Sequence, residues 1–377
     1  SAASRLRQQR AWFAALAVFE VGKPWREADA EVVEAIDFLD YYCAGAVELA
    51  QGKAVNQQPG ESNRYHYVPR GVCAVIAPWN FPIGILAGMA SAALAAGNVV
   101  IVKPAEQSPI IASHFVRLLH EAGVPEDVIQ YLPGLGEEAG RALVEDPRVA
   151  LVMFTGSKAV GLSILRTVGH PAPTQRFLKH AVVEMGGKNA IVVDEDADLD
   201  EVIHGVLASA FGYQGQKCSA ASRLIVHAAL YDRLVERLIP AVSGLRVCDP
   251  VEPRCDLGPL IDPEALTRVT TAVTEAAVSS TCLYRAPADR LPAEGYFAGP
   301  ALFAEVDPRS PVAQEELFGP VVCLFRVRSF SEGLALANDT AYGLTGGVYS
   351  RSPSNLQEES EAFQVGNLYL NRPITGS

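Results

Sequence analysis

From Gly71 onward, short apolar runs alternate with longer amphipathic or alanine-rich segments. Short runs that are rich in Val and Ile and bounded by Gly or Pro are typical of buried strands, whereas longer segments that close on Gly are typical of helices. The first part of this pattern predicts strands at residues 71–78, 99–104, 128–134, 149–157 and 180–187. It predicts helices between them at residues 82–97, 108–123, 137–146 and 158–169, the second with Ser108 as its cap and Pro109 at its first position.

The alternation continues from Asn189 with a second set of segments. It predicts strands at residues 189–194, 223–227, 320–327, 346–350 and 367–371, and helices at residues 198–213, 231–245, 263–278 and 331–338. A regular strand–helix alternation implies parallel, doubly wound sheets, which bind ligands beyond the carboxyl ends of their strands. The chain is therefore predicted to be an α/β protein with two parallel-sheet domains, whose boundary falls near Gly187–Asn189.

The residues before Gly71 follow a different pattern. Residues 5–21 and 29–50 have the character of helices, and residues 62–71 have that of an extended arm. A length of 377 residues is enough for two domains rather than one. The chain begins without Met and ends on the unusual sequence RPITGS, so we expect it to be part of a longer protein.

Composition and charge exclude several classes of function. The net charge is −12 and no run of Lys and Arg forms a basic stripe, so nucleic acid is not expected as a partner. The longest apolar stretch, residues 83–96, is too short and too rich in small residues to cross a bilayer, so no membrane association is expected. The N-terminal residues have no secretory signal pattern. The scattered cysteines make a reducing, cytoplasmic setting the expected location.

The cysteines and histidines give no sign of a metal centre. The seven cysteines are scattered, odd in number and without a CxxC motif, which argues against a disulfide framework and against a zinc site. The seven histidines form neither HxxxH nor HExxH. No metal is therefore expected.

Two segments are candidates for holding a nucleotide, although the GxGxxG motif is missing. In FTGSKAVG, Gly156 and Ser157 end a strand and open a helix, where free N–H groups can hold a pyrophosphate. In VKPAEQSP, Lys103 and Glu106 follow the second strand, where an acidic residue commonly binds a ribose. Taken alone, such segments are more often a helix cap and a solvated loop.

Two further segments offer groups for acid–base chemistry and for an oxyanion. Glu184 ends an apolar strand in VVEMGGKNA, and desolvation there raises the pKa of a carboxylate toward values that suit a general base. Asn80 in APWNFP lies where a strand gives way to a helix, so its amide can donate to an oxyanion. The simpler alternatives are an exposed glutamate at a strand end and a helix-capping asparagine.

The segment GYQGQKCSAASR places Cys218 between a Gly- and Gln-rich turn and a string of small residues. A free cysteine is usually a small buried hydrophobic residue, and we expect this of Cys73, Cys323 and the other four. Cys218 is expected to have flexible polar neighbours instead, and the adjacent Lys217 favours the thiolate. Cys218 is therefore the candidate nucleophile, with simple packing as the alternative.

In order and spacing, these five segments and EELFGP at residues 315–320 resemble the NAD(P)-dependent aldehyde dehydrogenase superfamily. Six ordered motifs, spread from about Gly71 to Asn371, are a specific signal. Within the superfamily, GYQGQKCSAASR, YGLTGGVYSR and GNLYLNRPITG are similar to the glutamate γ-semialdehyde (pyrroline-5-carboxylate) dehydrogenases. The resemblance implies a Rossmann-like NAD-binding domain at 1–61 and 72–187, part of an extended oligomerisation arm at 62–71, a catalytic domain at 188–370 and the start of a substrate-anchoring loop at 371–377.

The resemblance also implies a mechanism on a small-molecule substrate. Cys218 attacks the aldehyde, Asn80 and the Cys218 backbone N–H hold the oxyanion, and Glu184 activates the water that hydrolyses the thioester. The implied cofactor is NAD, which takes the hydride. Its implied contacts are Ile76, Pro78, Trp79, Lys103, Ala105, Glu106, Gly136, Gly140, Phe154, Thr155, Gly156, Ser157, Met185, Gly186, Glu316 and Phe318. The implied substrate contacts are Phe81, Lys217, Ser219, Thr375, Gly376 and Ser377.

The superfamily begins before this chain and continues after it, so the resemblance leaves assembly and the anchoring loop open. For the complete protein it implies a homo-oligomer. Three alternatives stay open at this point. The first is another aldehyde dehydrogenase, acting on succinic semialdehyde or on general aliphatic aldehydes. The second is a cysteine hydrolase or acyl transferase, which no histidine motif supports, and the third is a non-catalytic fragment that keeps the fold.

Overall fold

The computed structural model describes residues 1–375, apart from the side chains of residues 358 and 359. It divides the chain into two compact units, and each is described by itself below. The second unit includes a short segment from the N-terminal region, which the expected ranges assign to the first domain. The first unit comprises Ser1–Val21 and Trp25–Met185, and the second comprises Gly22–Pro24 and the chain from Gly186 onward.

The first unit is built on a sheet of five strands in the order β3-β2-β1-β4-β5. Every neighbouring pair is parallel, and all five predicted strands are present. The chain runs outward from β1 to β3 and then returns to the other side of β1. In open parallel sheets, ligands commonly bind at such a point of reversal. The strands are β1 (Val72–Ile76), β2 (Val99–Lys103), β3 (Ile129–Tyr131), β4 (Val149–Thr155) and β5 (His180–Glu184).

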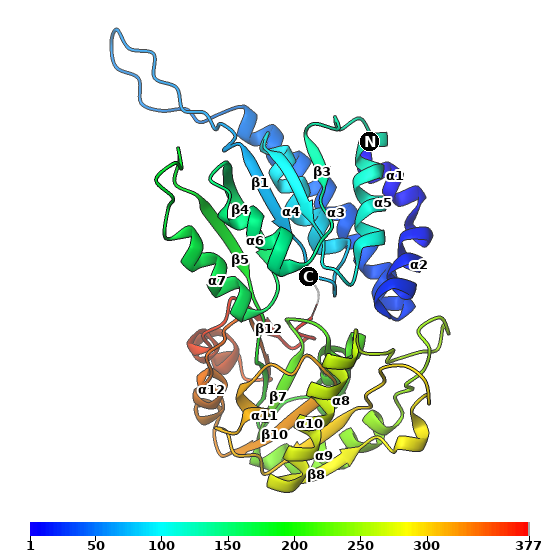
Figure 1. Ribbon diagram of the computed structural model, residues 1–377. Coiled ribbons are helices and arrows are strands. Elements are labelled where there is room, and N and C mark those ends of the chain that lie inside the picture. The colour runs from blue at the N-terminus through cyan, green and yellow to red at the C-terminus, as the bar shows by residue number, and fades with distance from the viewer. Residues whose placement is uncertain (376–377) are drawn as a thin grey trace. The chain divides into compact units, whose positions relative to one another are not determined.

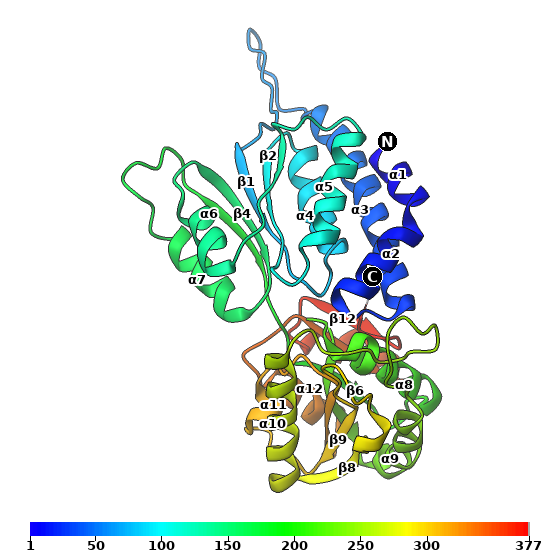
Figure 2. The same ribbon diagram turned by 45° about the vertical axis from the view of Figure 1, so that its right-hand side comes forward.

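Helices cover both faces of this sheet (Figure 1). Figure 2 shows α4 and α5 on one side of the sheet and α6 and α7 on the other. On the latter side, Ala74, Val152 and Ile164 share one apolar core, as the doubly wound pattern predicts. The helices are α4 (Gly84–Ala95), α5 (Pro109–Glu121), α6 (Arg141–Glu145), which follows a π-helical turn at Gly136–Gly140, and α7 (Lys158–Val168).

The N-terminal region consists of three helices, where the sequence predicts two. They are α1 (Ala2–Gln8), α2 (Arg10–Val21) and α3 (Trp25–Ala50). The helix predicted at residues 5–21 is interrupted at Gln9, and α3 begins before the predicted residue 29.

A carboxylate from α3 caps the helix that follows β1. Glu31 is buried, and its Oε1 accepts hydrogen bonds from the N–H groups of Ile83 and Gly84, both at 2.9 Å. The first N–H groups of a helix have no partner inside the helix, so a carboxylate at this end satisfies them and interacts favourably with the helix dipole.

A second carboxylate, that of Glu20 in α2, caps the start of α5. Glu20 accepts from the N–H of Ile110 at 2.5 Å and from the N–H of Ile111 at 2.8 Å. Ser108 stands at the N-cap position of α5 as predicted, but its side chain caps no N–H group. The prediction that Ser108 caps this helix is therefore wrong, because Glu20 takes the donors that a serine cap would use.

We expect Glu31→Ala to lower the free energy of unfolding of the first unit by about 2 kcal/mol, because it leaves two buried N–H groups without an acceptor. Urea denaturation measures the change. Glu48→Ala is the matched control, since Glu48 lies on the exposed end of the same helix, and it should cost less than about 0.5 kcal/mol. Equal losses in the two variants would remove the capping role from Glu31.

Residues 51–70 form a long loop that extends away from the sheet of the first unit (Figure 1). Its two sides meet where the N–H of Lys53 donates to the carbonyl oxygen of Tyr65 at 3.0 Å. The rings of Tyr65 and Tyr67 lie edge to face with their centres 5.3 Å apart, and both side chains are exposed. The expected arm at residues 62–71 is one side of this loop, and its part in oligomerisation stays a prediction.

The second unit is built on a seven-stranded sheet in the order β12-β11-β6-β7-β10-β9-β8. All neighbouring pairs are parallel except β8 and β9, which are antiparallel. The strands are β6 (Asn189–Val193), β7 (Ala221–His227), β8 (Thr281–Arg285), β9 (Ala301–Ala304), β10 (Val321–Val327), β11 (Thr345–Tyr349) and β12 (Asn367–Leu370).

Successive residues of the central strands face two different cores. In β6, Ala190 and Val192 pack into one core with α10 and α12, whereas Ile191 and Val193 pack into the other with α8 and α9. This burial on both faces explains why β6 is a continuous apolar run and not an alternating one. The helices are α8 (Leu199–Val206), α9 (Ala228–Ser243), α10 (Pro263–Ser279), α11 (Pro311–Gln314) and α12 (Phe330–Asn338).

The prediction of an α/β protein with two parallel-sheet domains is confirmed, with differences in detail. The sequence pattern does not reveal β8, β9 or α11. Most residues of β8 keep exposed surface, and β9 has only four residues, so neither shows a clear apolar run. The helix predicted to reach residue 213 ends as an α-helix at Val206 and passes into π-helical and 3-10 turns.

Candidate active site

The predicted site residues that belong to the first unit lie along one edge of its sheet. Because all five strands are parallel, their carboxyl ends share that edge. Along it lie Ile76, Pro78, Trp79, Asn80 and Phe81 at or after the end of β1, Lys103, Ala105 and Glu106 at or after the end of β2, Gly136 and Gly140 after β3, Phe154, Thr155, Gly156 and Ser157 at or after the end of β4, and Glu184 and Met185 at or after the end of β5.

Lys103 and Glu106 form an ion pair at the carboxyl end of β2. The Lys103 Nζ lies 3.1 Å from the Glu106 Oε2. The lysine side chain is 3% exposed and the glutamate side chain 41% exposed. Lys103 is therefore not the solvated lysine of the simpler alternative, and it holds in place a carboxylate that still faces solvent.

The Gly156–Ser157 turn opens α7 as predicted. The Ser157 Oγ accepts from the N–H of Val160 at 3.4 Å, and the N–H of Gly156 donates to the carbonyl oxygen of Glu184 at 3.1 Å. A Cβ on Gly156 would lie 2.6 Å from the ring of Phe154, so a larger residue here would require that ring to move. The exposed start of α7 therefore presents N–H groups and a hydroxyl beside the ends of β4 and β5.

Asn80 and Glu184 have different environments. Asn80 is 5% exposed and lies in the turn before α4, whose first N–H groups bond to Glu31. The N-cap position of α4 is Ile83 and not Asn80. Glu184 is the last residue of β5 and keeps exposed surface, while partial burial of its carboxyl group raises the pKa above the ordinary value of 4.5. A raised pKa makes a carboxylate a stronger base.

In the second unit, a buried asparagine holds the turn that carries the candidate thiol. The side-chain amide of Asn189, at the start of β6, donates to the carbonyl oxygens of Cys218 at 2.7 Å and of Ala220 at 2.9 Å. Its Oδ1 accepts from the N–H of Thr345 at 3.0 Å. Asn189 therefore ties the thiol turn to β6 and β11 and fixes the backbone on both sides of Ser219.

The residues before Cys218 are rigid, although the sequence suggests a flexible segment. Tyr213, Gln214 and Gly215 are buried and all have positive φ values of 51°, 57° and 70°. The Gln214 Nε2 donates to the carbonyl oxygens of Gly22 at 3.2 Å and of Pro259 at 2.9 Å. Two consecutive non-glycine residues in the left-handed region are strained, and such strain concentrates at functional sites.

Polar residues of this segment are also buried. The Oε1 of Gln216 accepts from the N–H of Ile261 at 3.0 Å, and Lys217 is 7% exposed. The expectation of flexible polar neighbours around Cys218 is therefore wrong, because tertiary contacts bury them. Cys218 and Ser219 themselves are half-buried.

Glu316 lies against the backbone at Gly186 and Gly187. Its Oε1 accepts from the N–H of Gly187 at 3.0 Å, and a Cβ on Gly186 would lie 2.0 Å from its Oε2. Burial raises the pKa of Glu316, while the Gly187 N–H and the Lys188 ammonium act in the opposite direction. Burial also lowers the pKa of Lys188 to about 8. Phe318 follows with a positive φ of 57°, a second strained position near the start of β10.

These residues of the second unit gather at the amino edge of its sheet. Cys218 precedes β7, Glu316 precedes β10, and Asn189 and Thr345 begin β6 and β11. This is the opposite edge from the one that carries the predicted site residues in the first unit. The predicted site residues therefore follow the rule that ligands bind at the carboxyl ends of parallel strands only in the first unit. The half-buried Thr375 follows Ile374, whose N–H donates to the Oγ of Ser209 at 2.9 Å, whereas Gly376 and Ser377 lie outside the described residues.

The other cysteines differ in environment from Cys218. Cys73 and Cys323 are fully buried, and burial raises their pKa values to about 12 and about 11. Cys43 and Cys282 are exposed, and Cys248 is half-buried. The expectation that all six are buried is therefore wrong for these three.

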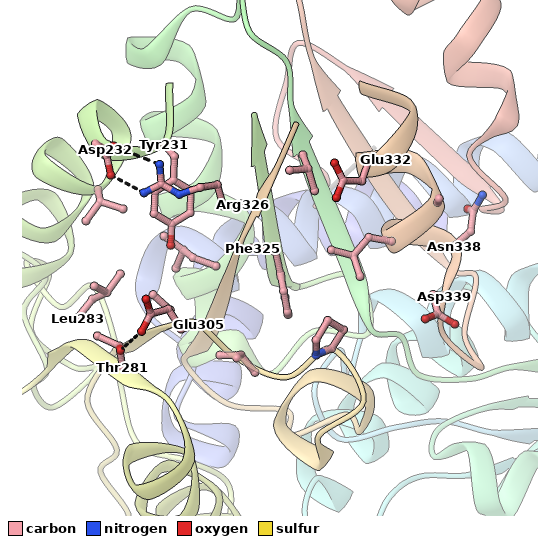
Figure 3. A pocket seen from close by; sticks show the side chains of 18 residues that line it. Tyr231, Asp232, Thr281, Leu283, Glu305, Phe325, Arg326, Glu332, Asn338 and Asp339 are labelled. Atoms are coloured by element: carbon pink, nitrogen blue, oxygen red, sulfur yellow. Dashed lines mark hydrogen bonds and ion pairs between the residues drawn. The ribbon is translucent and has the colours of Figure 1, made fainter. Parts of the chain in front are cut away.

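A hollow of about 990 Å³ lies elsewhere on the second unit (Figure 3). Two interactions join polar groups of its lining: Arg326 pairs with Asp232 at 2.5 Å, and Thr281 donates to Glu305 at 2.6 Å. It borders the carboxyl half of β10, away from Glu316 and Phe318, and none of the predicted site residues lines it. It is therefore no part of the candidate active site.

Comparison with known proteins places the chain in a family. The model of the aldehyde dehydrogenase family matches residues 1–377. The chain belongs to the aldehyde dehydrogenase family. Aldehyde dehydrogenases are oxidoreductases that act on aldehydes, and members of the family use NAD(P), so the predicted class of enzyme is confirmed.

Particular relatives of this aldehyde dehydrogenase are similar over its whole length. The 1-pyrroline-5-carboxylate dehydrogenase of Geobacillus kaustophilus is 45% identical over 376 residues, which are 73% of that protein. The structure of a 1-pyrroline-5-carboxylate dehydrogenase from Thermus with bound NAD matches with 46% identity and a TM-score of 0.96, covering 72% of that chain. Proline utilization A from Bdellovibrio bacteriovorus matches with 46% identity and a TM-score of 0.97, and this chain spans 39% of it.

Over residues 1–375, no helix is long and apolar enough to cross a membrane. In the same part of the chain, no group of three or more His, Cys, Asp and Glu side chains could hold a metal ion.

Two residues that position the thiol turn, Asn189 and Gln214, are not recognisable as such from the sequence pattern. Asn189 stands inside the quoted segment VVEMGGKNA, but only Glu184 is singled out there. Gln214 is counted as a flexible neighbour. A polar residue at the start of a fully apolar strand is the one local signal for Asn189, because a buried amide needs partners. Nothing local marks the partners of Gln214.

Proposed function

We propose that this aldehyde dehydrogenase oxidises glutamate γ-semialdehyde, the open-chain form of 1-pyrroline-5-carboxylate, to glutamate with NAD in proline catabolism. The observation that carries the proposal is 45% identity over 376 residues to a 1-pyrroline-5-carboxylate dehydrogenase. The segments GYQGQKCSAASR and GNLYLNRPITG, which resemble the same enzymes, agree with it.

In the proposed mechanism, Cys218 is the nucleophile. Its sulfur forms a bond to the aldehyde carbon, the carbonyl electron pair moves to the oxygen, and the Cys218 N–H and the Asn80 amide hold that oxyanion. Asn189 fixes the carbonyl of Cys218, so the thiol turn needs no rearrangement as charge develops. Loss of hydride from the carbon gives a thioester. Glu184 then takes a proton from water, whose oxygen attacks the thioester and releases the Cys218 thiolate with the product acid.

The residues at the carboxyl edge of the first sheet fit a dinucleotide. Glu106 offers a half-exposed carboxylate for a ribose hydroxyl, and the start of α7 offers N–H groups for a pyrophosphate. Glu316 in the second unit is proposed to bind the nicotinamide ribose, with Phe318 beside the ring. When bound, the cofactor supplies the hydride acceptor.

We expect NAD to be preferred over NADP. A 2′-phosphate at the position of the ribose hydroxyl meets the Glu106 carboxylate, which repels it, so KM should be higher for NADP by about tenfold or more, or about 1.4 kcal/mol. The isosteric control Glu106→Gln should reduce the difference between the KM values for NADP and NAD, since it removes the charge of the side chain and keeps its shape. A KM for NADP equal to or below that for NAD in the unmodified enzyme would contradict this prediction.

The substrate assignment is tested with a panel of aldehydes on the complete protein. Glutamate γ-semialdehyde carries an α-carboxylate, which backbone N–H groups and hydroxyls of the thiol turn and of the segment after β12 can bind. We expect a much larger kcat/KM for this aldehyde than for propionaldehyde or succinic semialdehyde, measured as NADH formation. Ser219→Ala should raise KM for the amino-acid aldehyde and leave propionaldehyde almost unchanged. Equal use of all three aldehydes overturns the assignment.

We further propose that the complete protein is a homo-oligomer that acts in the cytoplasm. The exposed side chains of Tyr65, Tyr67 and Val68 on the 51–70 loop support association, because water-exposed aromatic clusters are typical of interfaces. Analytical ultracentrifugation of the complete protein, with and without substitutions of these tyrosines by serine, tests the association.

A further inference from the structure

Two cysteines far from the predicted site residues in sequence lie together in the segment between α9 and α10. Cys248 and Cys255 are separated by six residues. Turns fold these residues back, with the N–H of Glu252 donating to Asp249 O and the N–H of Cys255 donating to Glu252 O, both at 3.0 Å. The chain on either side then pairs, as the N–H of Cys248 donates to Leu257 O at 3.0 Å. Backbone pairing therefore brings the two cysteines side by side.

The thiol group of Cys255 lies against the backbone of Cys248. The Cys255 Sγ donates to the carbonyl oxygen of Cys248 at 2.9 Å and to that of Leu257 at 3.1 Å. Burial and a hydrogen bond with the Cys248 thiol both raise the pKa of Cys255. Cys255 is 8% exposed, whereas Cys248 is half-buried. One thiol is thus accessible to a small oxidant, and the other is protected beside it.

A metal is a poor explanation for this pair. Zinc sites need four ligands, and no further His, Cys, Asp or Glu completes a group of three here among the residues that the structure describes. Packing alone is also a poor explanation, because a half-buried thiol adds little apolar burial.

We propose that Cys248 and Cys255 are a reversible disulfide site. Hydrogen peroxide first transfers one oxygen to the accessible Cys248 sulfur to give a sulfenic acid. Its other oxygen leaves as hydroxide, which takes up the proton of the Cys248 thiol and becomes water. The Cys255 sulfur then attacks the Cys248 sulfur, the S–S bond forms, and the sulfenic oxygen leaves as water with the proton of the Cys255 thiol. In total, two thiols and one peroxide give one disulfide and two waters. A dithiol such as dithiothreitol reverses the step by thiol–disulfide exchange.

The site lies on the segment that holds the turn before Cys218. Beyond Cys255 the chain runs through Leu257 to Pro259, whose carbonyl oxygen accepts the Gln214 amide at 2.9 Å. A Cβ on Gly258 would lie 2.5 Å from the carbonyl oxygen of Gly22, so this stretch is packed without free space. A disulfide at Cys248 and Cys255 therefore forms four residues from Pro259, whose carbonyl oxygen supports the strained turn at Gln214.

Peptide mapping of the full chain tests the proposal. Trypsin cleaves after Arg246 and Arg254, so the two cysteines fall in separate peptides, and Cys218 falls in a third that begins after Lys217. After exposure to peroxide and blocking with iodoacetamide, we expect a species in which peptides 247–254 and 255–268 are joined with the loss of two hydrogens. Dithiothreitol should separate them and restore alkylation of both cysteines.

Single variants and the exposed cysteines provide the controls. Cys248→Ser and Cys255→Ser should each abolish the joined species. Cys43 on α3 and Cys282 on β8 are exposed references for general oxidation. The proposal is overturned if the two peptides stay separate while Cys248 accumulates sulfinic acid. It is equally overturned if Cys248 is joined to Cys43 or Cys282 as often as to Cys255.

Discussion

Replacing Cys218 by alanine is expected to abolish aldehyde oxidation, with a loss of about three powers of ten or more in kcat, because a covalent nucleophile has no substitute in the site. The expectation rests on the half-buried position of this thiol on a turn that Asn189 and the Gln214 contacts hold rigid. Initial rates of NADH formation measure it.

The variant should still bind NAD, because the proposed cofactor residues of the first unit do not depend on the thiol. Titration of cofactor fluorescence measures that binding. Cys282→Ala is the matched control at an exposed cysteine, and it should leave kcat unchanged. A Cys218→Ala enzyme that keeps a tenth of the activity, or an equal loss in Cys282→Ala, would exclude a thioester route through Cys218.

Glu184→Gln is expected to separate the two halves of the reaction. The amide keeps the size of the side chain and removes the base, so hydrolysis of the thioester should slow by roughly 10²- to 10⁴-fold while the thiol still attacks the aldehyde. Stopped-flow measurements should show a burst of NADH equal to the enzyme concentration, followed by a slow steady rate. A uniform slowing of both phases would instead place Glu184 in the first step or in folding.

The pH dependence of hydrolysis gives an independent test of Glu184. The glutamate acts as a base only when it is deprotonated, so the hydrolysis rate falls as the pH drops through its pKa. Because partial burial raises this pKa above 4.5, the fall should occur at a higher pH than an ordinary glutamate would give. This fall in the hydrolysis rate at low pH should be absent in the Glu184→Gln variant.

Much of the fold could be predicted from the sequence because its signals are local. The runs that become β1, β2 and β6 are continuous and β-branched, since both faces of each strand are buried in a parallel sheet. The thiol, the Gly156–Ser157 turn and Glu184 stand at element ends, where a change of pattern draws attention to them. Similarity to a known family then gives each weak local signal a role.

The rest could not be predicted because it depends on contacts between distant parts of the chain. Glu31 caps a helix that begins more than fifty residues later. Glu20 caps α5, but the sequence pattern points to Ser108 at the N-cap position instead. Gln214 finds its acceptors at Gly22 and Pro259. The pairing of Cys248 with Cys255 likewise follows from turns and backbone pairing that no cysteine motif records.

The small segment Gly22–Pro24 limits how this chain can be divided by protein engineering. Lys23 is fully buried, and its ammonium group lies 4.6 Å from the centre of the Tyr213 ring, just before the strained Gln214. A gene cut between Met185 and Gly186 therefore yields a second polypeptide that lacks part of its own interior. A self-sufficient version of that half has to carry residues 22–24 as a grafted or separately supplied peptide, and a complementation screen between the two halves would depend on that tripeptide.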